Sequence, residues 1–386
     1  MYGPFLGLFA LLAALVGVYV YPTVQLLYRV GRIYESITPY NNDRCRSVHA
    51  PGLEGCEALA LHERSGLAFL ACGDMFTRQL WFLPSGQAST DNDKVFVYHA
   101  QSERILQLTL KGFSGVYKAL GIDVVESPNH PDHLTVMLVN QAADARGIEI
   151  FRYRLPTGSS DPSVRDKTVR HRLLASPHSV AAISDRAFYV TNSHRYASGL
   201  LRWVELLTGR PWADVVLRDT EGHIKLATKG IAAPTGITLN TAHSEAYVAS
   251  TATAAVHAYR ITPAGTLKLR ETIVLDGFPQ QITTDTTTGQ LYVTGILRPL
   301  EYFKYIRDPL SSAASQAGFK VWRVQNNTSA TRMFGINYHT DTVLMEPGPQ
   351  LPAGSVAVYE PRTQQLLVSS ALSPGILLCP VDPPSL

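Results

Sequence analysis

The stretch Ala246–Ile261, AYVASTATAAVHAYRI, decides the fold. In it, two short apolar runs are separated by a short segment of small and polar residues. Valine, tyrosine and isoleucine in such runs favour β-strands. The same arrangement occurs five more times, at Leu67–Ala71 with Val95–His99, Val136–Asn140 with Ile148–Tyr153, Phe188–Asn192 with Leu200–Leu206, Leu291–Gly295 with Phe319–Val324, and Leu366–Ser370 with Gly375–Val381. The body of the chain therefore contains six copies of one strand unit.

A further short apolar segment precedes each pair of runs. These segments are Glu57–Leu59, Leu120–Ile122, His178–Val180, Thr235–Ile237, Gln280–Ile282 and Gly354–Val356. Three or four strands per unit, in six units, predict an all-β fold, the six-bladed β-propeller. A two-sheet sandwich or two small β domains are the alternative architectures. In a propeller the innermost strands run along the central tunnel, so we expect the six preceding segments to ring its mouth.

One stretch breaks the repeat. Leu297–Ala317, LRPLEYFKYIRDPLSSAASQA, fits no strand unit and carries several aromatic residues. We interpret it as an insertion that forms a partly helical lid or loop.

The composition excludes several classes of protein. The chain has 386 residues, of which 45% are hydrophobic, so it has enough apolar surface for a core and is neither disordered nor fibrous. Lys and Arg number 34 against 31 Asp and Glu, which gives a net charge of +3 with no basic cluster. We therefore expect no nucleic-acid partner.

The N-terminus is apolar. No charged side chain occurs between Met1 and Tyr28, and Phe5–Tyr21 is apolar throughout. About 17 to 20 apolar residues fit either a cleaved signal peptide or a membrane-spanning signal-anchor. The missing A-x-A cleavage pattern favours the anchor. The predicted organisation is a signal-anchor or signal peptide at 1–28, a linker at 29–44 and the propeller at 45–386.

Two features bear on the compartment. Asn326 and Asn327 begin overlapping glycosylation sequons, and the four cysteines, Cys45, Cys56, Cys72 and Cys379, show no C-x-x-C spacing of a zinc site. Arg29 and Arg32, which follow the apolar run, would favour a propeller on the cytosolic side of the membrane. The sequons and cysteines favour the secretory pathway, with the body in the lumen of the endoplasmic reticulum, attached to the membrane through the N-terminal segment, or secreted.

Several motifs, in collinear order over about residues 40 to 386, resemble the serum paraoxonase/arylesterase family. They are Gly55–Leu61 with Gly66–Phe69 after Cys45, Thr168–Leu174, Phe188–Asn192 with His194, Thr288–Val293, and Ile376–Cys379. The resemblance implies a six-bladed propeller, a bridge between Cys45 and Cys379 that closes the ring, and a hydrophobic N-terminus retained as an anchor. The pairing of Cys56 and Cys72 is left open.

The resemblance also implies calcium-dependent hydrolysis of lactones and esters, with two calcium ions held by oxygen ligands. Matched one by one, Glu57 keeps an acidic ligand position, and Ile122 falls on a backbone-carbonyl ligand. The other ligand positions carry Ala58, His178, Ser179, Thr235, Gln280 and Gln281 here, and the catalytic histidines map to Leu120, Gln141 and Ile296. Calcium affinity depends on the number of charged ligands. We therefore expect the calcium site to be lost and no cofactor to be bound.

The expected ring is an apolar pocket with a few hydrogen-bonding groups, typical of a site for a hydrophobic small molecule. Its predicted catalytic residues are Glu57, His178, Thr235, Gln280 and Gln281. Its predicted substrate-binding residues are Leu120, Ile122, Asn140, Gln141, Ser179, His194 and Ile296. Each also has a structural interpretation, in which it caps a strand or fixes a loop.

Three functions fit this ring. The first is a cofactor-free enzyme that works by orientation and hydrogen-bond polarisation. Degenerate paraoxonase-like propellers of this kind resemble fungal hetero-Diels–Alderases, which join a tropolone quinone methide to a humulene-type terpene in secondary metabolism. The second is a lactonase or arylesterase, with Glu57 or His178 acting on water. The third is a non-catalytic ligand-binding propeller. The sequence leaves the substrate, the product stereochemistry and the oligomeric state undetermined.

Overall fold

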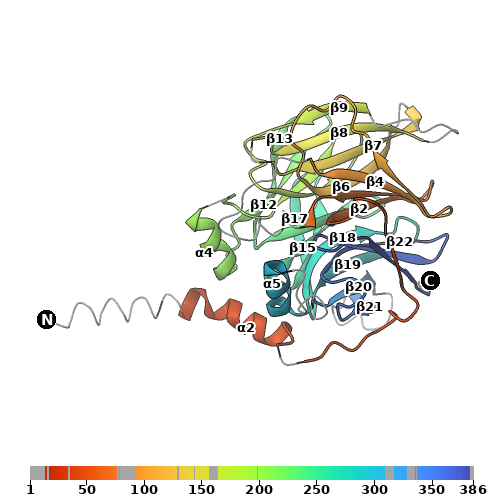
Figure 1. Ribbon diagram of the computed structural model, residues 1–386. Helices are drawn as coiled ribbons and strands as arrows, with labels where there is room; N and C mark the ends of the chain where they lie inside the picture. Colours follow the sequence, from red (N-terminus) through yellow and green to blue (C-terminus); the bar gives the residue numbers. More distant parts are fainter. Residues whose placement is uncertain are drawn as a thin grey trace.

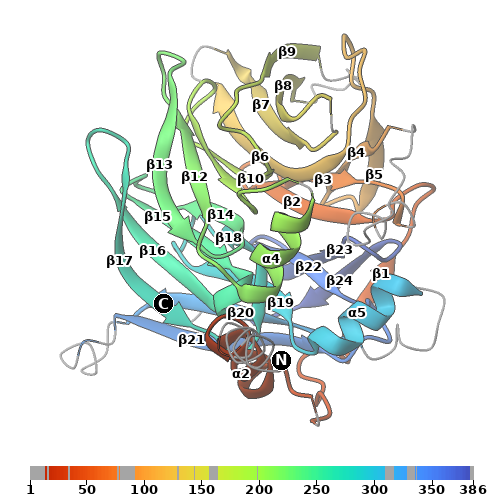
Figure 2. The same cartoon turned by 90° about the vertical axis from the view of Figure 1, so that its left-hand side faces the viewer.

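The computed structural model describes residues 14–382 except 15–16, 34, 76–77, 79–91, 128–129, 143, 156–163, 198, 309–316, 328–334 and 336. The described residues form six four-stranded antiparallel sheets arranged around a common axis (Figures 1 and 2). The innermost strands contact one another in a closed circle, which returns from the last sheet to the first. The prediction of a six-bladed propeller is confirmed.

Each of the first five blades takes its strands in chain order from the axis to the rim. Blade 1 contains β2 (Cys56–His62), β3 (Leu67–Cys72), β4 (Lys94–His99) and β5 (Arg104–Leu108); blade 2 contains β6 (Ala119–Ser127), β7 (His130–Asn140), β8 (Gly147–Arg154) and β9 (Val164–Val169); blade 3 contains β10 (Pro177–Ala182), β11 (Phe188–Asn192), β12 (Ala213–Arg218) and β13 (Ile224–Ile231). Blade 4 contains β14 (Pro234–Leu239), β15 (Glu245–Ser250), β16 (Ala255–Ile261) and β17 (Leu267–Val274), and blade 5 contains β18 (Phe278–Thr284), β19 (Leu291–Ile296), β20 (Phe319–Asn326) and β21 (Tyr338–Glu346).

Blade 6 joins the two ends of the propeller. It combines β22 (Gly354–Glu360), β23 (Gln365–Ser370) and β24 (Ile376–Pro380) with β1 (Arg46–Val48), which pairs with β24 at the rim. The Cys45–Cys379 disulfide lies beside this pairing and confirms the expected bridge. A second disulfide joins Cys56 to Cys72, which stand opposite each other on β2 and β3. Because disulfides persist in oxidising compartments, the two bridges indicate an extracellular or luminal protein.

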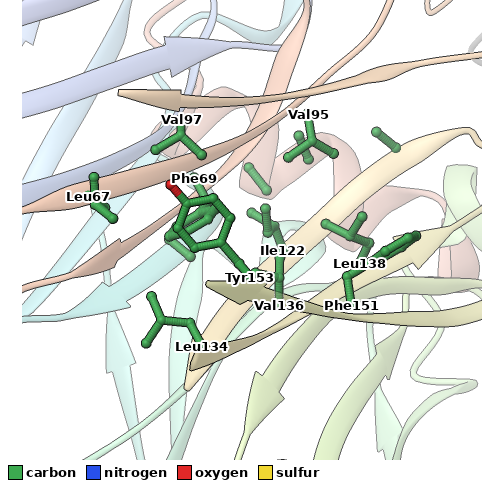
Figure 3. Close-up of a cluster of buried hydrophobic side chains, with 14 of the residues drawn as sticks. Leu67, Phe69, Val95, Val97, Ile122, Leu134, Val136, Leu138, Phe151 and Tyr153 are labelled. Atoms are coloured by element: carbon green, nitrogen blue, oxygen red, sulfur yellow. The ribbon is translucent and has the colours of Figure 1, made fainter. Parts of the chain in front are cut away.

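The hydrophobic core lies between neighbouring blades. Between blades 1 and 2, Phe69 packs edge to face on Tyr153, with ring centroids 5.1 Å apart and planes at 87°, and Ile122 lies in the same cluster (Figure 3). Such aromatic pairs stabilise a core beyond the area they bury. Because strands are buried on both faces, their sequences are continuous apolar runs rather than strict alternations.

One predicted strand is wrong. Leu200–Leu206 was expected as the partner of β11, but it lies in α4 (Leu200–Thr208), and the partner is β12. The sequence LLRWVELLT places Leu200, Val204 and Leu207 on one helical face. Gly209 ends the helix in the left-handed conformation, with φ of 58°, which glycine adopts without strain.

The insertion contains the predicted helix, α5 (Pro299–Arg307); part of the remainder, 309–316, lies outside the described residues. The inner face of α5 packs on blades 5 and 6 together with Leu26 and Leu27 of α2 (Tyr21–Val30). Figure 2 shows α2, α4 and α5 on one face of the propeller. The predicted linker, 29–44, therefore begins inside a helix that is docked on the blades.

Two predictions about processing fall largely outside the described residues. Most of Phe5–Tyr21 lies outside the described residues. None of the described helices has the length and apolarity to span a membrane. Asn326 is exposed at the end of β20 and Asn327 is buried, while the sequon residues after them lie outside the described range. Membrane attachment and glycosylation stay predictions.

Candidate functional site

One face of the propeller collects the loops that can form a site. In every blade the innermost strand begins beside the end of the second strand, so the loop after the second strand lies over the tunnel mouth. The loops after β7, β15 and β23 are short. The loops after β3, β11 and β19 are long and contain Arg78, α4 and α5. Among the described residues, blades 3 and 5 therefore contribute the helices α4 and α5 to this face.

All six innermost strands carry a register shift at their first residues. The shifts fall at Glu57, Leu120–Gly121, His178, Thr235–Gly236, Gln280 and Ser355. A bulge re-aims the extra residue relative to its neighbours, and bulges are frequent beside active sites. Within β10, β14 and β18, the residues His178, Thr235 and Gln280 are more exposed than the residues on either side. At these three bulges the predicted ring residue therefore keeps more access to solvent than its neighbours.

Glu57 is the carboxylate of this ring. Its side chain is buried, and burial raises its pKa to about 7, against the opposing effect of the Arg78 guanidinium. Arg78 Nη1 lies 3.9 Å from Glu57 Oε2. Ser355 holds the strand in place, because its hydroxyl donates to the Glu57 carbonyl oxygen over 3.3 Å. Near neutral pH Glu57 therefore exchanges a proton readily.

His178 is neutral. Burial lowers its pKa to about 4, against the opposing effect of its hydrogen bond to Thr235, and the Arg78 charge acts in the same direction as burial. Its Nδ1 lies 3.1 Å from the carbonyl oxygen of Thr235. A carbonyl only accepts hydrogen bonds, so Nδ1 carries the proton and Nε2 is left as an acceptor.

His194 stands beside this histidine in the loop after β11. Burial, with smaller contributions from Arg202 and His178, lowers its pKa to about 3, and its Nδ1 lies 3.0 Å from Ser193 Oγ. The ring thus has two uncharged imidazoles on the blade 3 side.

Hydroxyl and amide groups complete the ring. Thr235 Oγ1 lies 3.1 Å from Thr251 Oγ1, and Gln280 Nε2 donates to Tyr302 Oη over 3.4 Å. Tyr302 belongs to α5 and is buried, and burial followed by the nearby Glu57 charge raises its pKa. The hydroxyl therefore stays protonated and can donate a hydrogen bond.

Arg78 lies beside Glu57 and is almost fully buried. Its Nη2 donates to the carbonyl oxygen of Ala119 over 2.7 Å and lies 3.5 Å from Asp93 Oδ2. Asp93 also accepts from the Ala119 N–H over 2.8 Å and lies 3.6 Å from Lys118 Nζ. Glu57, Arg78, Asp93 and Lys118 form a buried cluster of two acids and two bases.

The remaining predicted residues support the ring. Asn140 Oδ1 accepts from the N–H groups of Lys118 and Ala142, and Gln141 donates to the Pro177 carbonyl oxygen over 2.6 Å. Ser179 and Gln281 are buried one residue beyond their bulges. Leu120 and Ile122 lie in cores between blades, and Ile296 packs beneath α5 beside Tyr302. The predicted roles of these residues, catalytic for Gln281 and substrate-binding for the others, stay predictions.

Sequence reasoning missed Arg78, Asp93, Ser355 and Tyr302. Ser355 stood inside a predicted inner segment, and Tyr302 stood in the predicted lid, so both had a signal. Arg78 and Asp93 lie outside any repeat, and no local pattern marks them.

The ring does not fit the calcium site that the family resemblance implies. Among the described residues, no three or more His, Cys, Asp or Glu side chains are placed to hold a metal ion. Glu57 is the carboxylate among neutral ring groups, and a guanidinium already stands 3.9 Å from it. A hard cation requires several anionic oxygens and no adjacent positive charge. No step of a mechanism is therefore assigned to calcium here.

Comparisons with known proteins agree with the fold. A family model described as arylesterase matches residues 114–371. Mouse serum paraoxonase/arylesterase 1 is 25% identical over 211 residues, which are 55% of this chain and 57% of that protein. Rat serum paraoxonase/arylesterase 2 is 26% identical over 62% of each chain, and rat serum paraoxonase/arylesterase 1 is 23% identical over 82% of this chain and 87% of that protein. The match to the mouse protein thus spans little more than half of its length.

Solved structures show the same architecture. A luciferin-regenerating enzyme superposes with a TM-score of 0.52 at 12% identity, covering 88% of this chain and 95% of that one. A putative gluconolactonase superposes with a TM-score of 0.50 at 12% identity, covering 88% and 92%. At this identity the likeness concerns the fold alone.

Proposed function

The chain belongs to the arylesterase family, and we propose that it hydrolyses an ester or lactone of a hydrophobic small molecule, with Glu57 as the general base. One observation carries this proposal. Glu57 is a buried carboxylate with a pKa of about 7, at a bulge of the innermost strand of blade 1, with the Arg78 guanidinium 3.9 Å away. A base whose pKa lies near the working pH is well suited to proton transfer.

The proposed reaction begins with water beside Glu57. The carboxylate takes a proton from water while the oxygen of that water attacks the carbonyl carbon of the substrate. The carbonyl oxygen becomes an oxyanion, which the Tyr302 hydroxyl and the Gln280 amide N–H groups can stabilise. When the carbon–oxygen bond to the leaving group breaks, Glu57 returns its proton to the departing alkoxide. The products are an acid and an alcohol, joined in one molecule for a lactone.

Glu57→Gln tests this role, because the amide keeps the shape of the side chain but accepts no proton. With phenyl acetate and a medium-chain lactone as probes, we expect kcat to fall about a hundred- to ten-thousandfold. Glu301→Gln, which removes a carboxylate that pairs with Lys304 on α5, is the control and should keep the wild-type rate. Hydrolysis of both probes at the wild-type rate by Glu57→Gln would refute the proposal.

A second candidate is the cofactor-free cyclase, including the hetero-Diels–Alder reaction of a tropolone quinone methide with a humulene-type terpene. The observation that favours it is the neutrality of three bulge residues, His178, Thr235 and Gln280, which can orient and polarise a substrate without a base. A cycloaddition incorporates no water, and its rate should survive Glu57→Gln. Joining of the quinone methide to the terpene, together with no hydrolysis of phenyl acetate or the lactone, would select this function. Binding of a probe without turnover would select the non-catalytic propeller.

A further inference from the structure

The tunnel contains a side-chain cation among oxygens of the kind that bind hard metal ions. Glu57 Oε2, Asp93 Oδ2 and the carbonyl oxygen of Ala119 surround the Arg78 guanidinium, at 3.9, 3.5 and 2.7 Å from its terminal nitrogens. Two carboxylates and a carbonyl are typical calcium ligands. Here the Arg78 guanidinium is the positive group next to all three oxygens.

The charges of this cluster balance when Glu57 is ionised. Glu57 and Asp93 stand against Arg78 and Lys118, and the neighbouring His178 is uncharged. Arg78 and Lys118 are both buried, so water screens them poorly. A divalent ion at the same oxygens would therefore add two uncompensated positive charges next to a guanidinium that cannot lose its proton.

We propose that Arg78 is the permanent cation of the tunnel: its guanidinium replaces a divalent ion, neutralises Glu57 and Asp93, and keeps calcium out of the ring. The proposal goes beyond the hydrolase assignment and does not depend on it, because it concerns the charge that the folded tunnel contains. Arg78 is therefore a positioning residue for Glu57 rather than a group that contacts the substrate.

The test measures binding of calcium to the full chain, without any substrate. Thermal unfolding in 1 mM EGTA and in 5 mM CaCl₂ should give the same Tm for the wild type, within about 1 °C. Arg78→Gln leaves two buried carboxylates without their shared cation, so its Tm should rise by several degrees with calcium. Isothermal titration with CaCl₂ should detect one site in this variant and none in the wild type.

Three further variants make the result specific. Arg78→Lys retains a positive charge and should not respond to calcium. Arg78→Gln combined with Asp93→Asn removes one of the two carboxylates and should lose the response gained by Arg78→Gln. Arg218→Gln removes another buried arginine, which donates to the Arg186 carbonyl oxygen in the turn between β10 and β11, and should behave as the wild type.

Two results would overturn the proposal. One is a wild type that calcium stabilises by several degrees or that binds calcium in the titration. The other is a folded Arg78→Gln variant that calcium leaves unchanged. If Arg78→Gln fails to fold, Arg78→Lys and the wild type decide, because a calcium response in either contradicts a permanent guanidinium cation. Hydrolytic activity enters none of these measurements, so they can fail or succeed independently of the proposed function.

Discussion

Gln280 and Tyr302 meet within blade 5, where Gln280 Nε2 donates to Tyr302 Oη over 3.4 Å. Gln280 is the bulged residue of β18, and Tyr302 lies on α5, so this contact joins the ring to the helix that covers it. The insertion after β19 is therefore part of the candidate site as well as a cover.

Removing the Tyr302 hydroxyl should weaken oxyanion stabilisation. For Tyr302→Phe we expect kcat/KM for ester hydrolysis to fall about a hundredfold, the usual effect of losing one such donor. Tyr305→Phe is the matched control on the same helix, because Tyr305 Oη donates instead to the Leu372 carbonyl oxygen. It should lower the free energy of unfolding by about 1–3 kcal/mol and leave kcat unchanged. Equal rates for the two variants would contradict the assignment of Tyr302.

The pH profile should report Glu57. Burial raises the pKa of this carboxyl from 4.5 to about 7, so the basic form gains population as the pH rises through 7 and is lost below it. We expect kcat/KM to rise about tenfold per pH unit below 7 and to level off above it. The imidazoles of His178 and His194 are already neutral throughout this range, so their titration should cause no further rise or fall in the pH profile. A profile that is flat between pH 5 and 8 would contradict Glu57 as the base.

The two disulfides should differ in their contribution to stability. The Cys45–Cys379 bridge spans 334 residues of sequence, and the Cys56–Cys72 bridge spans 16. In the chain-entropy account, the longer loop contributes about 6 kcal/mol and the shorter about 3 kcal/mol. Denaturant unfolding of Cys45→Ser/Cys379→Ser and of Cys56→Ser/Cys72→Ser measures both. The reverse order would show that loop length does not govern closure of this ring.

Asn140 should prove to be structural. It is fully buried, accepts from the N–H groups of Lys118 and Ala142, and donates to the Val116 carbonyl oxygen over 2.9 Å. Asn140→Ala leaves these backbone groups without partners, so the free energy of unfolding should fall by about 3 kcal/mol while KM stays unchanged.

Asn192 provides the comparison for this prediction. It ends the second strand of blade 3 and makes the equivalent contacts, accepting from the Ser176 N–H and donating to the Leu173 carbonyl oxygen. Asn192→Ala should therefore lose a similar free energy of unfolding. A higher KM for Asn140→Ala with unchanged stability would instead support the predicted role in substrate binding.

The fold followed from the sequence because each inner strand is a short apolar run with a small or polar start. That rule located Glu57, His178, Thr235 and Gln280, all of which stand at bulges in the structure. Repetition made the pattern visible six times. The prediction of a strand at Leu200–Leu206 was wrong because it counted apolar residues and ignored their spacing, which is typical of a helix.

The electrostatics of the site could not be predicted from local patterns. Arg78 and Asp93 come from the long loop after β3, and their meeting with Glu57 and Ala119 depends on how two blades pack. The sequence suggested a ring that had lost its charged cation ligands. It gave no sign that a guanidinium lies beside the carboxylate that remains.

The most direct test of the central claim, a base-catalysed site without a metal, is the rate of lactone hydrolysis by the wild type in excess EGTA at pH 8, with Glu57→Gln alongside. The account predicts full turnover by the wild type in the chelator, no gain on adding calcium, and at least a hundredfold loss in Glu57→Gln. Turnover that disappears in EGTA and returns with calcium would contradict it.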